Sequence, residues 1–400
     1  MSKGVAITGM GIISAIGNNV EENYQALING EKGITRVSKI QTIHKDAIMV
    51  GEIDFTNQEF EQQLGLSEDN NYSRTALLGV VAAKEAVKHA GIKDINDCKT
   101  GLISATSVGG MDMTEKYYYD YLTNEATQKY IEGHHAGDST QKIAEQLGIE
   151  ESLVTTISTA CSSAANAIMM GARLIKSGQL DRVIVGGADC LSKFTINGFK
   201  TLMILSDTYN TPFDDNRKGL NLGEAAAFLV LESEAVVKAN NREVLAYVKG
   251  YGNANDAYHQ TASSDNGDGA TLAMEKALKV SGLQPSDIDY INAHGTATAN
   301  NDLSEGRAII RVFGENVPDF SSTKAFTGHT LAAAGAIEAV YAVLAIQNDV
   351  VYPNLNFETQ MQEFGITPQL TLKEKTLNTI MSNSFGFGGN CSTVIFSKDA

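Results

Sequence analysis

The residues most able to do chemistry in this sequence are one cysteine and two histidines in unusual settings. Cys161 stands where a short β-branched stretch, residues 155–158, gives way to an alanine-rich segment that favours helix up to Ile175. Free backbone N–H groups and the helix dipole at such a junction favour an anion, so the thiol is expected to shift toward the thiolate. A lone cysteine among alanines is also a common small core residue. The position therefore indicates either a nucleophile or a packing residue.

The two histidines stand at the ends of apolar segments. His294 closes the run IDYINAH and is followed by Gly-Thr, a setting typical of the carboxyl end of a strand, where sites of α/β proteins form. His329 begins a second alanine-rich segment, five residues after Lys324. Taken singly, each histidine could be structural. Three others, His44, His134 and His135, are expected to be solvated loop residues.

Composition narrows the classes of function. The 400 residues carry 31 Lys and Arg against 47 Asp and Glu, a net charge of −16, which argues against nucleic acid or an anionic membrane as main partner. The four cysteines are scattered without metal-ligand spacing, so we expect no metal site and a reduced, cytoplasmic compartment. The N-terminus lacks a signal-peptide core, and no apolar run approaches a membrane span.

An internal repeat indicates how these residues are brought together. The segments Ala86–Thr106 and Ala277–Thr296 each combine a helix ending near a glycine, a short acidic loop and a strand. The alanine-rich segments that follow Cys161 and His329 form a second matching pair. We therefore predict two βαβ-type halves, 1–240 and 241–400, joined by a linker at 238–242. In a duplication about a pseudo-dyad, the two buried helices meet and their N-termini share one site.

Local signals give further expectations. Val5–Thr8 resembles a buried strand that enters a glycine-rich turn. In this turn Gly9 and Gly11 fit the dinucleotide-binding fingerprint, but Gly17 does not stand at the required spacing, so the motif disfavours nucleotide binding. Helices are expected from Asn18 or Asn19 to Gly30, over Ser73–Ala90, and from Asp138 or Ser139 to Gly148. Strands are expected at 101–105, 182–186 and 226–232, with a final hairpin around the loop FGFGGN.

Taken together, several motifs resemble the condensing-enzyme (thiolase-fold) family, and within it the β-ketoacyl-[acyl carrier protein] synthases I and II. They span Val5 to Phe396 in family order: VAITGMGIISAIGNN, TACSS, VIVGGAD, GEAAAFLVLE, DAYHQT, NAHGTAT, STKAFTGHTLAAAGAIEAV and SNSFGFGG. The resemblance implies an α/β fold of five layers, α-β-α-β-α, from two duplicated halves. It also implies a homodimer or related heterodimer, a Cys-His-His triad and no bound cofactor, the phosphopantetheine thioester being delivered by acyl carrier protein.

The resemblance assigns a role to each matching residue. Cys161 would take the acyl chain as nucleophile, and its backbone N–H would form the oxyanion hole with that of Phe387. His294 and His329 would hydrogen-bond the malonyl thioester oxygen while CO2 leaves. The remaining assignments are an electrostatic role for Lys324, a supporting hydrogen-bond network for Glu338, the gate between the malonyl and acyl pockets for Phe387, and the acyl tunnel for Val108.

The sequence departs from the family pattern in three places. GFGG is followed by Asn390-Cys391 rather than Thr-Asn, the loop before the PFD turn is several residues shorter, and the basic stretch before the Ser73 helix retains only Arg74. Arg74, Lys116 and Lys200 are the remaining cations expected near the tunnel mouth, where an acidic carrier protein would dock.

We thus expect decarboxylative Claisen condensation of malonyl-ACP with an acyl chain on Cys161, giving β-ketoacyl-ACP in fatty acid elongation. An alternative is a ketosynthase of a dedicated type II pathway, for an aryl polyene or polyketide. A non-catalytic partner subunit that shapes a chain-length tunnel is disfavoured because Cys161, His294 and His329 are all present. A biosynthetic thiolase is disfavoured because Cys391 is not in the Cys-x-Gly setting of that branch.

Overall fold

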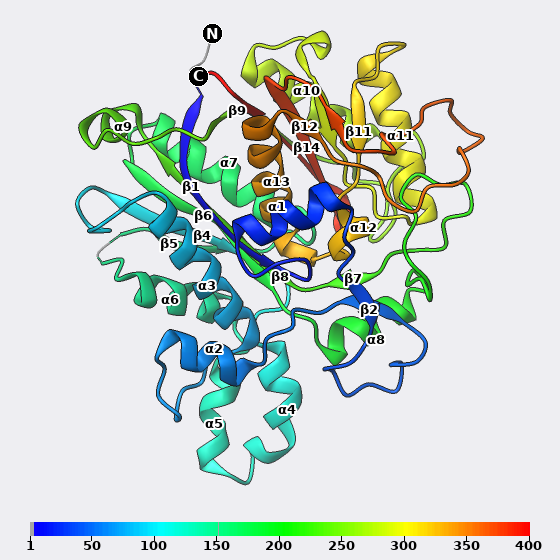
Figure 1. Cartoon of the computed structure of the whole chain (residues 1–400). Coiled ribbons are helices and arrows are strands. Elements are labelled where there is room, and N and C mark those ends of the chain that lie inside the picture. Colours follow the sequence, from blue (N-terminus) through cyan, green and yellow to red (C-terminus); the bar gives the residue numbers. More distant parts are fainter. Residues whose placement is uncertain (1–3, 151) are drawn as a thin grey trace.

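Ten strands form one continuous sheet in the computed structural model, which describes residues 4–150 and 152–400 (Figure 1). The first three residues of the N-terminal segment considered in the sequence analysis lie outside the described residues. The strand order is β11-β10-β14-β15-β9-β1-β8-β6-β4-β5. The bounds are β1 Val5–Ser14, β4 Thr100–Ala105, β5 Val154–Ile157, β6 Arg182–Asp189, β8 Ala225–Glu232, β9 Ala246–Asn255, β10 Tyr290–Asn292, β11 Asp319–Ser321, β14 Thr379–Gly386 and β15 Asn390–Ser397.

The sheet consists of two five-stranded halves with the same pattern of pairing. In the first half β5, β4 and β6 are parallel, whereas β8 and β1 continue the sheet antiparallel. In the second half β11, β10 and β14 are parallel, whereas β15 and β9 are antiparallel. The halves join where β1 pairs with β9, Val5 facing Val248. This repeated topology confirms the predicted duplication.

Helices complete the five predicted layers. On the outer face of the first half lie α3 and α6, and on that of the second half lie α10 and α11, while α7 and α13 contact each other between the two half-sheets (Figure 1). The bounds are α3 Arg74–His89, α6 Ala136–Leu147, α7 Ser163–Lys176, α10 Asp268–Ser281, α11 Ala299–Phe313 and α13 Ala334–Asn348. The fold is therefore α/β with layers α-β-α-β-α.

Smaller elements surround this frame. The helices are α1 Val20–Asn29, α2 Asn57–Leu64, α4 Met111–Tyr121, α5 Glu125–Glu132, α8 Lys193–Thr201, α9 Glu234–Ala239 and α12 Lys324–Thr327, with 3-10 turns at Pro285–Asp287, Leu331–Ala333 and Phe387–Gly389. The short strands are β2 Ile34–Arg36, β3 Met49–Gly51, β7 Leu222–Gly223, β12 Val350–Val351 and β13 Lys373–Glu374. The predicted linker is partly helical, since α9 ends at Ala239.

The prediction of a glycine-rich turn after Thr8 is wrong, because β1 continues through these residues to Ser14. A Cβ on Gly9 would lie 2.4 Å from the carbonyl oxygen of Ala86, and one on Gly11 would lie 2.2 Å from that of Ala82. Both carbonyls belong to α3. These two glycines therefore let a helix pack directly on the strand, as glycine does where backbones approach closely.

The helix-start signals are confirmed in two cases and wrong in a third. Asn19 caps α1, whose last turn ends at Gly30, and Ser73 caps α3. Asp138 and Ser139, however, lie inside α6, which begins at Ala136. The ring of His135 accepts a hydrogen bond from the Gly137 N–H at 3.0 Å, so this exposed histidine caps the helix.

The two central helices are packed by small side chains. A Cβ on Gly335 of α13 would lie 2.8 Å from the backbone nitrogen of Ala165 in α7. The segment Leu331–Asn348 is apolar enough in length and composition to span a membrane, contrary to the expectation from sequence, with a mean hydropathy of 1.4 over 18 residues. However, 89% of that segment is buried inside the protein. It is a core helix, as its place between the two half-sheets requires.

Candidate active site

Cys161 lies in a sharp turn between β5 and α7. Ala160 has a φ of 52°, an uncommon conformation for a residue with a side chain, and its carbonyl accepts a hydrogen bond from the Ser163 N–H at 3.1 Å. The Ser163 hydroxyl accepts a further bond from the Thr159 N–H at 2.7 Å. This turn places the thiol at the start of α7, on the side that faces the second half of the protein.

Both histidines meet at this thiol, although they come from distant parts of the chain. His329 Nε2 lies 3.0 Å from Cys161 Sγ, within hydrogen-bond reach. The ring of His294 stands nearly perpendicular to that of His329, at 87°, with 5.4 Å between the ring centroids. All three residues are buried, with His294 and His329 each 2% exposed. The structure thus brings together the three residues singled out from sequence.

A buried carboxylate positions His294. Glu305, on α11, accepts hydrogen bonds from the backbone N–H groups of His294 and Gly295, each at 2.8 Å. The Asn383 side chain of β14 donates a third bond to Glu305 at 3.1 Å. The histidine therefore sits at the end of β10 in a backbone conformation fixed from two neighbouring elements.

His329 is positioned through its backbone and through the turn that follows it. Its N–H donates to the Asn221 carbonyl at 2.7 Å, and its carbonyl accepts from the Gly223 N–H at 3.0 Å. Asp189, at the end of β6, accepts from the Ala332 N–H at 2.8 Å and from the Val108 N–H at 3.2 Å. One buried carboxylate thus connects the His329 turn with the loop that carries Val108.

The environment of Cys161 does not favour the thiolate, contrary to the expectation from its place at a helix start. Burial raises the pKa of the Cys161 thiol to about 12, outweighing the lowering by Lys324 and by the backbone N–H groups of Phe387 and Cys161. Those two N–H groups hydrogen-bond the sulfur, so they lie beside the position where the oxyanion of an acyl group on Cys161 would form. The protonated thiol must therefore lose its proton as it reacts.

The two histidines are held neutral. Burial lowers the pKa of both rings well below the usual range, and the Lys324 ammonium lowers each further. A neutral imidazole offers one N–H donor and one acceptor nitrogen, and the tautomer of His329 decides whether its Nε2 donates to the Cys161 sulfur or accepts from the thiol. Such rings can donate to a developing oxyanion without protonating a nearby carbanion.

These histidines should make the fold sensitive to acid. Folding lowers the pKa of both histidines, so as pH falls below 6.5 the unfolded chain takes up these protons before the folded protein does. The free energy of unfolding therefore decreases as pH falls below 6.5, and the stabilising contribution of the neutral rings is present only above that pH. Urea unfolding of His294→Gln should show a free energy of unfolding that falls less steeply than in the wild type, by up to about 1.4 kcal/mol per pH unit. His44→Gln, in a surface loop, is the control. Equal slopes in wild type and His294→Gln would contradict this prediction.

A buried ion pair lies behind the histidines. Lys324 Nζ contacts Glu338 Oε1, and the two side chains are 2% and 1% exposed. Burial raises the pKa of Glu338 to about 7, although Lys324 lowers it. The pair places a positive charge near both rings, which explains its effect on their pKa values.

A cavity of about 230 Å³ opens onto the thiol. Its lining includes Cys161, His294, His329, Phe199 and Phe387. The Phe387 ring stacks on Phe199 of α8, with 5.8 Å between centroids. Val108 does not line this cavity; it is buried in the hydrophobic cluster beneath α3, with an exposed fraction of 8%.

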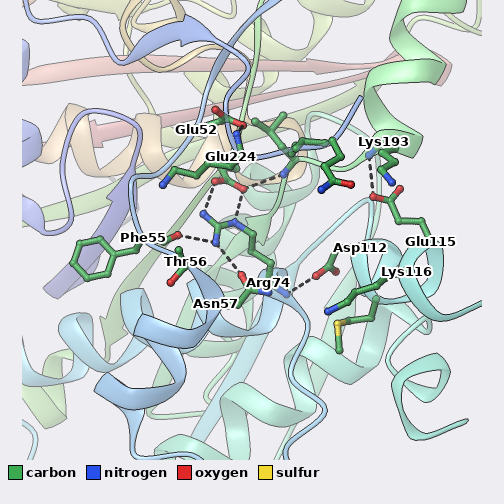
Figure 2. Close-up of a pocket in the computed structure, with 15 residues that line it drawn as sticks. Glu52, Phe55, Thr56, Asn57, Arg74, Asp112, Glu115, Lys116, Lys193 and Glu224 are labelled. Atoms are coloured by element: carbon green, nitrogen blue, oxygen red, sulfur yellow. Dashed lines mark hydrogen bonds and ion pairs between the residues drawn. The ribbon is translucent and has the colours of Figure 1, made fainter. Parts of the chain in front are cut away.

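Arg74 is a structural residue and not a free surface cation, which corrects the expectation from sequence. It makes two hydrogen bonds to Glu224, at 2.7 and 2.8 Å, and its side chain is 12% exposed (Figure 2). The same view shows Lys116 and Lys193 at the edge of the neighbouring surface pocket. Lys116, Lys193 and Lys200 are exposed.

Comparisons with known proteins agree with this geometry. The model of the beta-ketoacyl synthase N-terminal domain matches residues 2–236, and that of the C-terminal domain matches residues 245–358. The 3-oxoacyl-[acyl-carrier-protein] synthase 2 of Staphylococcus aureus (strain N315) is 33% identical over 413 residues, covering 99% of each chain. A solved structure of the ishigamide ketosynthase/chain length factor superposes with a TM-score of 0.91 at 28% identity, covering 100% of both chains. One chain of the solved complex of the ketosynthase ApeO with its chain length factor ApeC, from Xenorhabdus doucetiae, superposes with a TM-score of 0.86 at 32% identity, covering 100% of this chain and 98% of that one. With a thiol and two neutral histidines around one cavity of a matching fold, this chain belongs to the β-ketoacyl synthase family of condensing enzymes.

Proposed function

We propose that this enzyme condenses a malonyl unit on acyl carrier protein with an acyl chain held on Cys161, releasing CO2 and β-ketoacyl-ACP. The observation that carries the proposal is the contact of Cys161 Sγ with His329 Nε2, at 3.0 Å, beside His294. We further propose a cytoplasmic location, in keeping with four cysteines that are all free.

In the first half-reaction Cys161 attacks the acyl thioester. The bond from sulfur to the acyl carbon forms, the bond to the carrier thiol breaks, and the thiol proton of Cys161 ends on the departing carrier thiol. The high pKa of the buried thiol makes proton loss part of this step, with His329 within reach of the sulfur. The N–H groups of Cys161 and Phe387 would hold the tetrahedral oxyanion.

In the second half-reaction malonyl thioester loses CO2. The electron pair of the breaking carbon–carbon bond moves onto the thioester as an enolate, whose oxygen would accept hydrogen bonds from His294 and His329. Because both rings are neutral, they stabilise this oxygen without quenching the carbanion. The carbanion then attacks the acyl carbonyl on Cys161 and releases the cysteine sulfur, which regains a proton.

The direct test is a reaction of the purified protein with malonyl- and acyl-loaded carrier protein, followed by mass spectrometry. We expect a β-ketoacyl product and, without malonyl, an acyl adduct on Cys161. Absence of both products with carrier-bound and free pantetheine thioesters would overturn the proposal. The mass of the adduct isolated from the native host would also separate fatty acid elongation from an aryl polyene or polyketide pathway.

We propose that a second, related subunit, identical or not, covers the edge of the sheet at β5. In the described part of the chain, β5 ends the strand order and pairs only with β4. Helices α4 and α5 project from the body of the molecule, and α4 exposes the side chains of Tyr119, at 88%, and Leu122, at its end, at 82% (Figure 1). A paired sheet edge and covered aromatic rings are what a stable dimer provides. Sedimentation at micromolar concentration would measure a monomer if this proposal is wrong.

Val108 is predicted to limit acyl length, a role suggested by the family resemblance and by the Asp189 carboxylate that connects its loop with the turn after His329. Val108→Phe should shorten the product range while acetyl-primed turnover continues. Because Val108 is also packed in the core, Val108→Leu serves as a milder matched variant. Product profiles by mass spectrometry check the prediction; identical profiles in both variants and the wild type would refute it.

Carrier docking is predicted to depend on Lys200 of α8, the helix whose Phe199 lines the cavity. A chain of net charge −16 repels an acidic partner overall, so the few cations at the cavity mouth carry the attraction. Lys200→Glu should slow acylation of Cys161 by carrier-bound donors about two- to fivefold, the size expected of an exposed charge pair, and spare free pantetheine thioesters.

Lys279→Glu gives the same charge change on the outer helix α10 and is the matched control. The effect of Lys200→Glu should fade toward about 1 M salt, where the Debye length is about 3 Å. If Lys200→Glu slows acylation of Cys161 equally with carrier-bound and free donors, Lys200 supports the fold and not carrier docking.

A further inference from the structure

Asn390 lies at the centre of a polar cluster beside the active site. Its Oδ1 accepts hydrogen bonds from Asn166 Nδ2 at 2.9 Å and Asn253 Nδ2 at 3.0 Å. It also lies 2.7 Å from Ser162 Oγ, whose single hydroxyl hydrogen it shares with the Thr159 carbonyl at the same distance. We call Asn390, Ser162, Asn166, Asn253 and Ser392 the Asn390 cluster. The position is one of those where the sequence departs from the family pattern, so the motif does not account for the contacts.

The Asn390 cluster joins the two halves of the protein. Ser162 and Asn166 belong to the start of α7, directly after Cys161, whereas Asn253 lies on β9 and Ser392 on β15. Further hydrogen bonds support the cluster internally, since the Ser392 hydroxyl and the Asn253 amide each donate to Asn166 Oδ1, at 2.9 and 3.0 Å. Three donors that converge on one oxygen require an acceptor at that point.

Asn390 also closes the turn that carries Phe387. It pairs with Gly386 across the β14–β15 hairpin, and the turn between them passes through two glycines with φ of 81° and 80°. The backbone of this turn is attached to the second half, through Gly388 N–H to the Gln260 carbonyl at 2.7 Å and Asp256 N–H to the Gly389 carbonyl at 2.8 Å. The Asn390 side chain attaches the same turn to the first half, at the residue next to the nucleophile.

We propose that Asn390 is a positioning residue that holds the turn Phe387–Gly389 closed over Cys161. With the Ser162–Asn390 bond in place, the Phe387 N–H faces the thiol and its ring stays against Phe199. Without the Asn390 side chain, its contacts with both Ser162 and Asn166 of α7 are lost, so the glycine-rich turn is tied to one half only and can move away from the nucleophile. The consequence for turnover rests on the proposed function, but the closure itself does not.

Closure can be measured by alkylation of Cys161 with iodoacetamide, followed by peptide mass spectrometry. Asn390→Ala should speed alkylation at least about fivefold, the factor that corresponds to one net hydrogen bond, and Ser162→Ala, which leaves the Asn166–Asn390 bond in place, should speed it less. An opened turn admits the reagent and hydrates the thiol, which brings its raised pKa back toward that of free cysteine. Because Asn390→Ala already removes the contact with Ser162, the double variant should be no faster than Asn390→Ala alone.

Two controls distinguish positioning from loss of structure. Asn390→Asp keeps the acceptor oxygen and should alkylate at the wild-type rate, whereas Asn378→Ala removes an exposed asparagine at the other end of the same hairpin and should also have no effect. Alkylation of the buried Cys190 should not change in any variant, because faster labelling there would report general unfolding.

Condensation assays supply the functional measurement. Asn390→Ala should lower kcat with little change in KM, because a mobile Phe387 N–H is lost from the transition state, and Asn390→Asp should restore kcat. Unchanged alkylation in both Asn390→Ala and Ser162→Ala would overturn the positioning role even if condensation is intact. Faster alkylation in a protein whose wild type condenses nothing would instead refute the proposed function and leave the positioning role standing.

Discussion

Replacing Cys161 by alanine should lower condensation at least about a thousandfold, the scale of loss when an enzyme's nucleophile is removed. The acyl chain would have no sulfur to occupy, and the remaining N–H groups and histidines can only bind substrates. The fold should persist, since the substitution removes one small buried atom from a chain with a large core. Intact mass after incubation with an acyl donor measures the first half-reaction, and product formation measures the whole.

The matched control is Cys391→Ala. Cys391 is also buried, and burial raises the pKa of its thiol to about 12, so burial and basicity resemble those of Cys161. Cys391 does not, however, line the cavity that holds His294 and His329. Activity should therefore survive Cys391→Ala. An acyl adduct that persists in Cys161→Ala and disappears in Cys391→Ala would show that the nucleophile is misassigned.

The overall architecture could be predicted because the sequence repeats it. The two alanine-rich segments have nearly no polar face, which requires burial between layers, and each begins at a chemically capable residue, Cys161 or His329. The paired strand patterns then place both helix starts at one site. The structure has that arrangement, with α7 and α13 in contact and the thiol 3.0 Å from the ring.

Residues that act through long-range contacts could not be predicted from sequence. Glu305 has no local pattern that marks it as buried, yet it orients the backbone at His294. Asp189 orients the turn after His329, and its place at the end of the buried strand VIVGGAD was a usable local signal, although its partner was not. Arg74 resembled a surface cation because its partner, Glu224, is 150 residues away in the chain.

The thiol shows why a local rule can fail. A helix start favours the thiolate, and the N–H groups of Phe387 and Cys161 do lower the pKa of the Cys161 sulfur. Complete burial has the opposite and larger effect, because the charged thiolate loses the stabilisation that water would give it, and the nearby positive charge and N–H groups replace only part of it. Sequence reveals the helix start but not the depth of the cavity, so the sign of the shift needed the structure.

Replacing either histidine by alanine should impair decarboxylation far more than acyl transfer. The two rings are neutral donors placed around the thioester oxygen, and loss of one such donor costs about 10²–10³ in rate. Acylation depends mainly on Cys161 and on the N–H groups of Cys161 and Phe387, which neither variant removes. His294→Ala should therefore still form the acyl adduct at a substantial rate while release of CO2 from malonyl thioester nearly stops.

His329→Ala should separate the two half-reactions less cleanly. His329 Nε2 contacts the sulfur at 3.0 Å, whereas the ring of His294 lies against the rings of His329 and Phe385. Acylation should thus be slower in His329→Ala than in His294→Ala, with decarboxylation lost in both. His294→Asn and His329→Asn, which restore an N–H donor without a titrating ring, should recover part of the CO2 release. Rapid CO2 release from both alanine variants would exclude these rings as the donors.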